Sequence, residues 1–241
     1  MTNIQRIIAL VALPLLALSA HAQDNSLSKQ EKKEGWQLLF DGKTTQGWHT
    51  YNHGSDGTAW KATDGLLWLD PSQKDGWQVK GGGDLLTDGE YENYHLSLEW
   101  KVADSANSGI IFNIKEDPKY KNSWYTGLEM QVLDDNGHPD RQYVSHRAGC
   151  LYDLIAVSKS TVNPAGQWNK AEIILNKGDL KLYLNGVNVV STTMWTEDWK
   201  KLVAGSKFKA MPDFATYKTG RIGLQDHGNQ VWFRNIKIRK L

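Results

Sequence analysis

The sequence predicts an all-β fold, a two-sheet antiparallel β-sandwich of the jelly-roll type. Several short segments alternate apolar and polar residues, and a period of two is typical of strands with one buried and one open face. Dipeptides that favour tight hairpins separate such segments, with Asn185-Gly186 as the strongest example, and no long segment has a helical period. Short strands joined by such turns favour a sandwich. The alternating segments are residues 96–102, 110–114, 128–132, 180–184 and 231–233, and the other hairpin dipeptides are Asp64-Gly65 and Lys177-Gly178.

Residues 1–22 have the pattern of a secretory signal peptide. Arg6 precedes a mostly apolar run from Ile7 to Leu18, and Ala20-His21-Ala22 has the small-x-small form of a signal-peptidase site. This run is too short for a comfortable membrane span, and no second apolar stretch of about 18 residues follows it. We therefore expect an exported protein, periplasmic or extracellular, without membrane insertion.

Residues 23–35 are polar, charged and free of aromatic side chains. Such a composition predicts a disordered or loosely helical leader. We expect a single β-sandwich domain over residues 36–241.

Three connections between the expected strands are longer than ordinary hairpin loops. They cover residues 115–125, 135–147 and 195–219, and the last contains the one expected helix, at about 197–204. Long loops on an otherwise tight sandwich usually belong to a binding face.

The composition narrows the classes of partner and the source of stability. Cys150 is the only cysteine, so no internal disulfide can form and the core must hold the fold. We expect Cys150 to be a small buried residue. Without Arg6, the signal's only charged side chain, basic and acidic residues balance, which gives no electrostatic case for nucleic acid or an anionic membrane. The 11 tryptophans suit either a sandwich core or a carbohydrate cleft.

Strand parity places a set of polar residues opposite the apolar ones. In a jelly roll one sheet curves around a concave groove, and side chains of this parity can line it. An isolated glutamate on an open strand face is more often simply solvated, so the groove is indicated by the set and by its neighbouring loops. The residues with this parity are Glu99, Asn113, Glu129, Gln131, Gln225 and His227, with Asp134 at a strand end. The flanking loops add Trp124, Tyr125, His138, His146, Arg147 and Tyr152.

Other catalytic patterns have no support in the sequence. There is no G-x-S-x-G elbow, no H-E-x-x-H, no phosphate loop and no C-x-x-C. His49, His53 and His95 lack a comparable context, and we expect them to be surface residues.

Seven motifs along the chain resemble those of one family, the 3-keto-disaccharide hydrolases. The resemblance covers nearly the whole mature chain and implies a fold similar to concanavalin A-like lectins and glucanases. The glutamate, the glutamine and the histidine of the groove motifs are kept. The motifs are LFDGKTTQGW (39–48), NSGI (107–110), EMQVLD (129–134), AGQWN (165–169), LNG (184–186), GRIGLQDHG (220–228) and FRNI (233–236).

The resemblance implies a small carbohydrate substrate and a chemistry for the groove. A ketone at C3 of a sugar acidifies the hydrogen on C2, so a base can remove it and the glycosidic oxygen can leave C1; addition of water then completes a net hydrolysis. Glu129 and His227 are the candidates for proton transfer or for binding a divalent cation such as Ca²⁺, Mn²⁺ or Zn²⁺. The candidate substrate-binding residues are Gln131, Asp134, Gln225, Asn113, Trp124, Tyr125, Arg147 and Tyr152.

Two other functions fit parts of the same pattern. A glucanase-like hydrolase needs two carboxylates on one strand face, and Gln131 stands where the partner carboxylate would be. A non-catalytic, lectin-like carbohydrate-binding module explains the fold, the aromatics and the groove equally well. The sequence leaves open the leaving group, the anomeric preference, the metal, the oligomeric state and whether cleavage proceeds by elimination or by direct hydrolysis.

Overall fold

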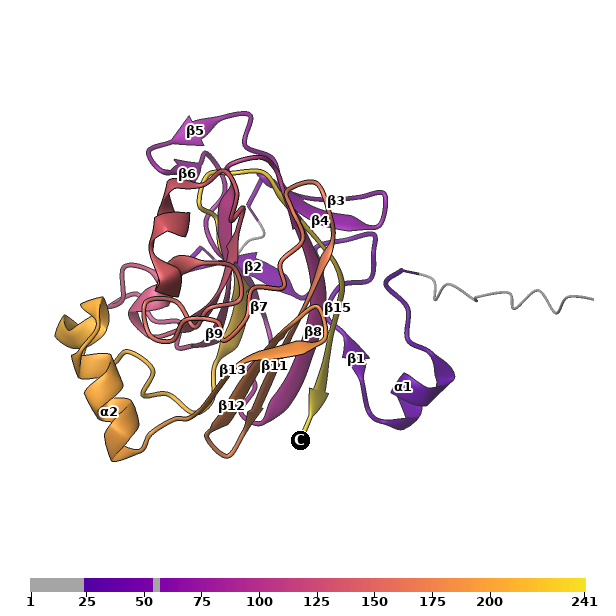
Figure 1. Cartoon of the computed structure of the whole chain (residues 1–241). Helices are drawn as coiled ribbons and strands as arrows, with labels where there is room; N and C mark the ends of the chain where they lie inside the picture. Colours follow the sequence, from indigo (N-terminus) through magenta and orange to yellow (C-terminus); the bar gives the residue numbers. More distant parts are fainter. Residues whose placement is uncertain (1–23, 54–56) are drawn as a thin grey trace, which may run out of the picture.

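The computed structural model describes residues 24–53 and 57–241, so the expected signal peptide, residues 1–22, lies outside the described residues. The described strands form two antiparallel sheets packed face to face, which confirms the predicted sandwich (Figure 1). In this part of the chain, no helix has the length and apolar character needed to cross a membrane.

The larger sheet has eight strands in the order β13-β12-β11-β8-β15-β4-β3, with β1 also pairing with β15. The last strand in the chain, β15, therefore lies inside this sheet, between β8 and β4. The bounds are β1 (Gln37–Leu38), β3 (Trp60–Thr63), β4 (Leu66–Leu69), β8 (Tyr94–Val102), β11 (Asn169–Asn176), β12 (Asp179–Leu184), β13 (Val187–Thr193) and β15 (Val231–Lys240).

The smaller sheet has five strands in the order β10-β9-β14-β7-β2, and a separate two-stranded hairpin, β5-β6, stands beside it at the top of Figure 1. The strands are β2 (Trp48–Thr50), β7 (Leu85–Thr87), β9 (Asn107–Ile114), β10 (Leu128–Leu133) and β14 (Arg221–Leu224), and the hairpin is β5 (Lys74–Asp75) with β6 (Gln78–Val79).

The hydrophobic core lies between the two sheets. Alternate residues of the central strands, such as Trp100 on β8, Phe112 on β9 and Phe233 on β15, are fully buried there. Because side chains alternate along a strand, their neighbours point to the open faces of the two sheets. Cys150 is also fully buried, as expected.

All three predicted hairpin turns are confirmed. Asp64-Gly65, Lys177-Gly178 and Asn185-Gly186 join β3 to β4, β11 to β12 and β12 to β13. Both residues of each turn have positive φ, between 51° and 94°, as a type I′ turn requires.

The expected helix is α2 (Glu197–Ala204), with the Thr196 side chain capping its first turn through the backbone N–H of Trp199. The long connections also contain four 3₁₀ turns. These are η1 (Ser123–Tyr125), η2 (Pro139–Gln142), η3 (Val144–His146) and η4 (Lys207–Ala210).

The segment expected to be a loose leader is attached to the sandwich. It contains the short helix α1 (Lys29–Lys33), which begins with a capping box between Ser28 and Glu31. Asn25 and Asn235 exchange hydrogen bonds, each donating its backbone N–H to the other's side-chain oxygen, at 2.6 and 2.9 Å. The polar composition did not predict this ordered structure, because polar contacts with β15, rather than burial of apolar side chains, hold the segment in place.

Candidate functional site

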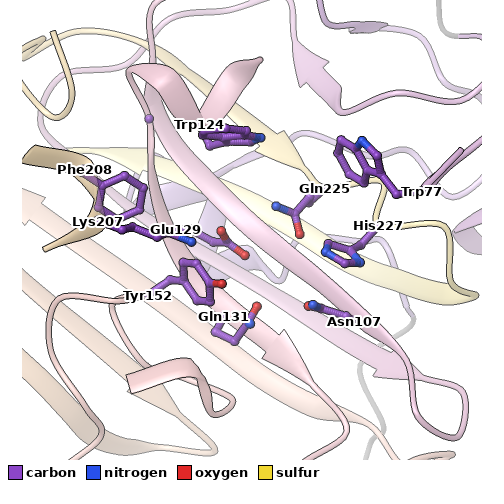
Figure 2. A pocket seen from close by; sticks show the side chains of 11 residues that line it. Trp77, Asn107, Trp124, Glu129, Gln131, Tyr152, Lys207, Phe208, Gln225 and His227 are labelled. Atoms are coloured by element: carbon purple, nitrogen blue, oxygen red, sulfur yellow. The ribbon is translucent and has the colours of Figure 1, made fainter. Parts of the chain in front are cut away.

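A cavity of about 230 Å³ opens on the face of the five-stranded sheet that points away from the core (Figure 2). Strands β9 and β10 form its floor, and loops from distant parts of the chain form its walls. Strand β10 is buried at every position, because core side chains cover one face and these loops cover the other. The lining residues are Trp77, Asn107, Trp124, Gly127, Glu129, Gln131, Tyr152, Lys207, Phe208, Gln225 and His227.

Glu129 lies at the centre of the floor, on β10, and only 8% of its surface is exposed. Gly109 on β9 gives this side chain its room: a Cβ there would meet the Glu129 carboxylate oxygen at 2.2 Å. Burial raises the pKa of Glu129 to about 8; the positive charge of Lys207 and a hydrogen bond with Gln225 act against this shift, and the charge of Asp84 adds to it. Glu129 is therefore a carboxyl group that can hold or release a proton near neutral pH.

Two buried amides present unpaired oxygens at this cavity. Asn107 and Gln225 are 3% and 6% exposed, and within the described residues neither Asn107 Oδ1 nor Gln225 Oε1 has a hydrogen-bond partner. Buried polar atoms are nearly always paired, so these two oxygens are suited to accept hydrogen bonds from a ligand's hydroxyl groups. Gln131 differs, because its Oε1 accepts a hydrogen bond from the backbone N–H of Val132.

Lys207 supplies positive charge on one side of Glu129 (Figure 2). It begins η4, where its backbone N–H donates to Asp153 at 2.9 Å and its Nζ lies 4.0 Å from the ring centroid of Tyr152. In the described part of the chain, no carboxylate lies within salt-bridge distance of Lys207 Nζ. Sequence reasoning missed Lys207 and Phe208, because no strand parity applies to a loop; the only signal was the length of the 195–219 connection.

His227 and Trp77 form the opposite side, with ring centroids 5.5 Å apart. Burial lowers the pKa of His227, and nearby His138, whose ring is 6.4 Å away, lowers it further. The imidazole is therefore held in its neutral form, which can donate a hydrogen bond from one ring nitrogen.

The buried carboxylates of Asp84 and Asp226 connect the cavity walls. Asp84 accepts hydrogen bonds from the hydroxyl of Ser123, next to Trp124, and from the backbone N–H of Asp226, between Gln225 and His227. Burial raises the pKa of Asp84 to about 6. Neither aspartate was singled out from the sequence, because residues that hold a wall in place carry no motif of their own.

Asn113 does not line the cavity, contrary to expectation. A register shift separates the pairs Arg221↔Ile114 and Gly223↔Ile111, and Asn113 lies in that irregular stretch with φ +57°. Strand parity fails across such a bulge. The side chain instead accepts a hydrogen bond from the Tyr94 hydroxyl and donates to the backbone carbonyls of Tyr217 and Lys218.

Three further candidates for substrate binding lie outside the cavity lining. Asp134 accepts hydrogen bonds from the backbone N–H groups of Ser105 and Asn136, so it shapes a turn. Tyr125 packs against Trp124, with ring centroids 4.9 Å apart. Arg147 lines a separate surface depression and donates to the carbonyl of Arg141.

Two other expectations from the sequence also change. Glu99, which shares the parity of Glu129, lies on the open face of the other sheet and pairs with Arg234. His49 and His95 are not free surface residues: His49 contacts Asp88 and Glu116 at 2.6 and 2.8 Å, and His95 contacts Glu172 at 3.2 Å.

The residues at this cavity do not make a metal site by themselves. A protein site for Zn²⁺, Mn²⁺ or Ca²⁺ generally needs three or more protein ligands. Within residues 24–53 and 57–241, no group of three or more His, Cys, Asp or Glu side chains could hold a metal ion. Glu129 and His227, the two candidates from the sequence, are not joined by a third such ligand.

Comparison with known proteins places this chain among carbohydrate-active proteins. The profile of the 3-keto-alpha-glucoside-1,2-lyase-like domain matches residues 35–239. A 3-keto-disaccharide hydrolase of Bacteroides thetaiotaomicron is 33% identical, over 91% of this chain and 83% of its own length.

Solved structures agree on the fold. A Parabacteroides distasonis protein, crystallised as a candidate glycosyl hydrolase, superposes with a TM-score of 0.82 at 34% identity, over 91% of this chain and 100% of that one. The carbohydrate-binding module CBM66 of Bacillus subtilis superposes with a TM-score of 0.50 at 13% identity, over 80% of this chain and 96% of that module, which shows likeness of fold alone.

Proposed function

The chain belongs to the 3-keto-alpha-glucoside-1,2-lyase-like family, and from this premise we propose that it is a glycoside hydrolase that cleaves 3-keto-disaccharides and related 3-keto-glycosides. The observation that carries the proposal is Glu129, a carboxyl group buried at the floor of the cavity with its pKa raised to about 8. A base for abstracting a proton next to a ketone works best when its pKa lies near the working pH.

The order of groups along the cavity matches the order of atoms in a 3-keto sugar. Lys207 and Tyr152 lie on one side of Glu129, and His227 lies on the other (Figure 2). A sugar with C2 over the Glu129 carboxylate would direct its C3 ketone toward Lys207 and its C1 oxygen toward His227. Asn107 Oδ1 and Gln225 Oε1 remain to accept hydrogen bonds from sugar hydroxyls.

In the proposed reaction, ionised Glu129 takes the proton from C2. The electron pair of that C–H bond moves toward the C3 carbonyl, and the Lys207 ammonium stabilises the negative charge on its oxygen. The C1–C2 double bond then forms as the C1–O bond breaks. The leaving oxygen accepts a hydrogen bond from His227 and receives the proton held by Glu129. Addition of water across the double bond, with the hydroxyl at C1, completes a net hydrolysis.

The test compares a 3-keto-glucoside that carries a chromogenic leaving group with the same glucoside before oxidation. We expect the purified chain to release the chromophore from the keto sugar only, with or without chelator. Release from both sugars would contradict the role of the ketone. Release from neither, together with retained sugar binding, would indicate a carbohydrate-binding module. Loss of activity with chelator would show a cation that these side chains do not hold alone.

We also propose that the chain acts outside the cytoplasm, after cleavage behind Ala22. The support is the signal-peptide pattern of residues 1–22. N-terminal sequencing of the protein secreted by a bacterial host should begin at Gln23, and an uncleaved cytoplasmic product would contradict this.

A further inference from the structure

Trp77 is exposed in a way that the core of this protein does not explain. It lies in the turn between β5 and β6, outside both main sheets, and 48% of its surface is exposed. Among the tryptophans of the described chain, no other is exposed to this extent. Placing an indole ring in solvent gives up the free energy that burial would provide, so an exposed ring at a cavity mouth indicates a contact surface.

The hairpin that carries Trp77 is fixed to the cavity wall. The Asp226 carboxylate accepts hydrogen bonds from the backbone N–H groups of Val79 and Gly83, at 3.0 and 2.8 Å, and from that of Gly228 at 2.8 Å. At Gly228, with φ +74°, a Cβ would meet the carbonyl oxygen of Trp77 at 2.3 Å. Only glycine allows this approach, so Trp77 has a set position beside His227.

Trp77 lies on the side of the cavity opposite Lys207. In Figure 2, Lys207 and Tyr152 lie on one side of Glu129, and His227, Trp77 and Asn107 lie on the other. On the reaction proposed above, the His227 side receives the C1 oxygen, so whatever is attached to that oxygen must extend toward Trp77. Asn107, whose buried Oδ1 has no hydrogen-bond partner in the described chain, lines the same side.

We propose that Trp77, with Asn107, forms the subsite that binds the leaving sugar of a 3-keto-disaccharide. A sugar ring offers an apolar C–H face to the indole ring and hydroxyl donors to Asn107 Oδ1, whereas a small alkyl leaving group reaches neither. Trp77 is thus a specificity-determining residue that favours disaccharides. The inference rests on the proposed cleavage of 3-keto-glycosides.

The experiment measures kcat/KM for a 3-keto-disaccharide and for methyl 3-keto-glucoside. We expect Trp77→Ala to lower kcat/KM about tenfold on the disaccharide, the loss of one good aromatic contact, and less than about twofold on the methyl glycoside. Trp77→Phe should recover most of the loss because it keeps a flat ring. Trp68→Ala, on the open face of the other sheet, is the matched control and should leave kcat/KM unchanged for both substrates.

The outcomes separate the two proposals. If Trp77→Ala lowers kcat/KM equally on both substrates, or on neither, the assignment of the leaving-group subsite is wrong. The proposed activity then still stands. If the wild-type protein cleaves neither substrate, the proposed activity fails and this inference fails with it. Circular dichroism and thermal melting of Trp77→Ala and Trp77→Phe establish that the variants are folded.

Discussion

On the open face of the eight-stranded sheet, Glu99 accepts hydrogen bonds from Arg234 at 2.7 Å and from Asn235 at 3.2 Å. On the open face of the five-stranded sheet, Glu129 has no cation within salt-bridge distance in the described chain, and burial raises its pKa to about 8. The two glutamates have the same strand parity, yet one is paired and the other is kept reactive. Of the two, the glutamate without a paired cation is the one that lines the cavity.

The lysines of the two faces show the same contrast. Lys101 Nζ lies 4.7 Å from the ring centroid of Trp232 and 5.1 Å from that of Trp168, so its charge makes cation–π contacts with two indole rings. Lys207 contacts the ring of Tyr152 and faces the Glu129 carboxyl across the cavity. The outer face is stabilised by its charges, whereas the cavity face holds charges that a substrate can use.

The largest expected effect is on turnover when each glutamate is neutralised. Glu129→Gln should lower kcat on a chromogenic 3-keto-glucoside by about 10³-fold, because it removes the base. The matched variant Glu99→Gln should change kcat by less than about twofold. Equal effects of the two substitutions in steady-state assays would remove the distinction between the faces.

The lysine pair should give the next largest effect. Lys207→Met keeps an unbranched chain but loses the charge opposite the developing enolate, so we expect kcat to fall about 100-fold with a smaller change in KM. Lys101→Met loses a charge that lies over two indole rings on the other sheet and should leave kcat unchanged. A larger change in KM than in kcat for Lys207→Met would assign it to substrate binding instead.

The pH dependence of kcat/KM tests the state of Glu129 directly. A base with a pKa of about 8 is mostly protonated at pH 6, so the rate should rise about tenfold per pH unit there and level off above pH 8. A rate that falls through pH 8 would instead assign Glu129 as a general acid. A profile that is flat from pH 6 to 9 would show that its protonation is not required.

The smallest effect is on thermal stability, which the two Glu→Gln substitutions should change in opposite directions at pH 9. The raised pKa of Glu129 means that protonation stabilises the folded state fully below about pH 4.5, and this contribution is lost as pH rises through about 8. Glu129→Gln should therefore be more stable than the wild type at pH 9 and nearly equal to it at pH 5. Glu99→Gln should lose about 1 kcal/mol at both pH values. Differential scanning calorimetry at pH 5 and pH 9 measures the stability of both variants. If Glu129→Gln were less stable than the wild type at pH 9, the claim that the buried charge of Glu129 destabilises the fold would be wrong.

The fold could be predicted because its signals are local. A two-residue turn such as Asn185-Gly186 needs positive φ at both positions, and few residue pairs other than Asn-Gly accept it readily. The bounds of α2 follow from Thr196 as its N-cap and from the acidic residues of its first turn. These requirements are met within a few residues, so the sequence displays them.

The cavity could be predicted only in part, because its walls depend on distant contacts. Strand parity correctly predicted that Glu129, Gln131, Gln225 and His227 share one surface. It could not show that Glu99 lies on the other sheet. Trp77 and Lys207 come from loops whose positions are set by Asp226 and Asp153, each far away in the chain. Asn113 was misplaced by a bulge that no residue pattern announced.

The position of β15 has a consequence for how the chain folds. Residues Val231–Lys240 pair with β8 on one side and with β4 and β1 on the other, so without β15 the eight-stranded sheet falls into three separate parts, β13-β12-β11-β8, β4-β3 and β1. The sheet can therefore close only when β15 is in place. Contacts between such distant segments make closure of the sheet slow. Removal of β15 should abolish the native state, because the three parts of this sheet would then have no strand between them.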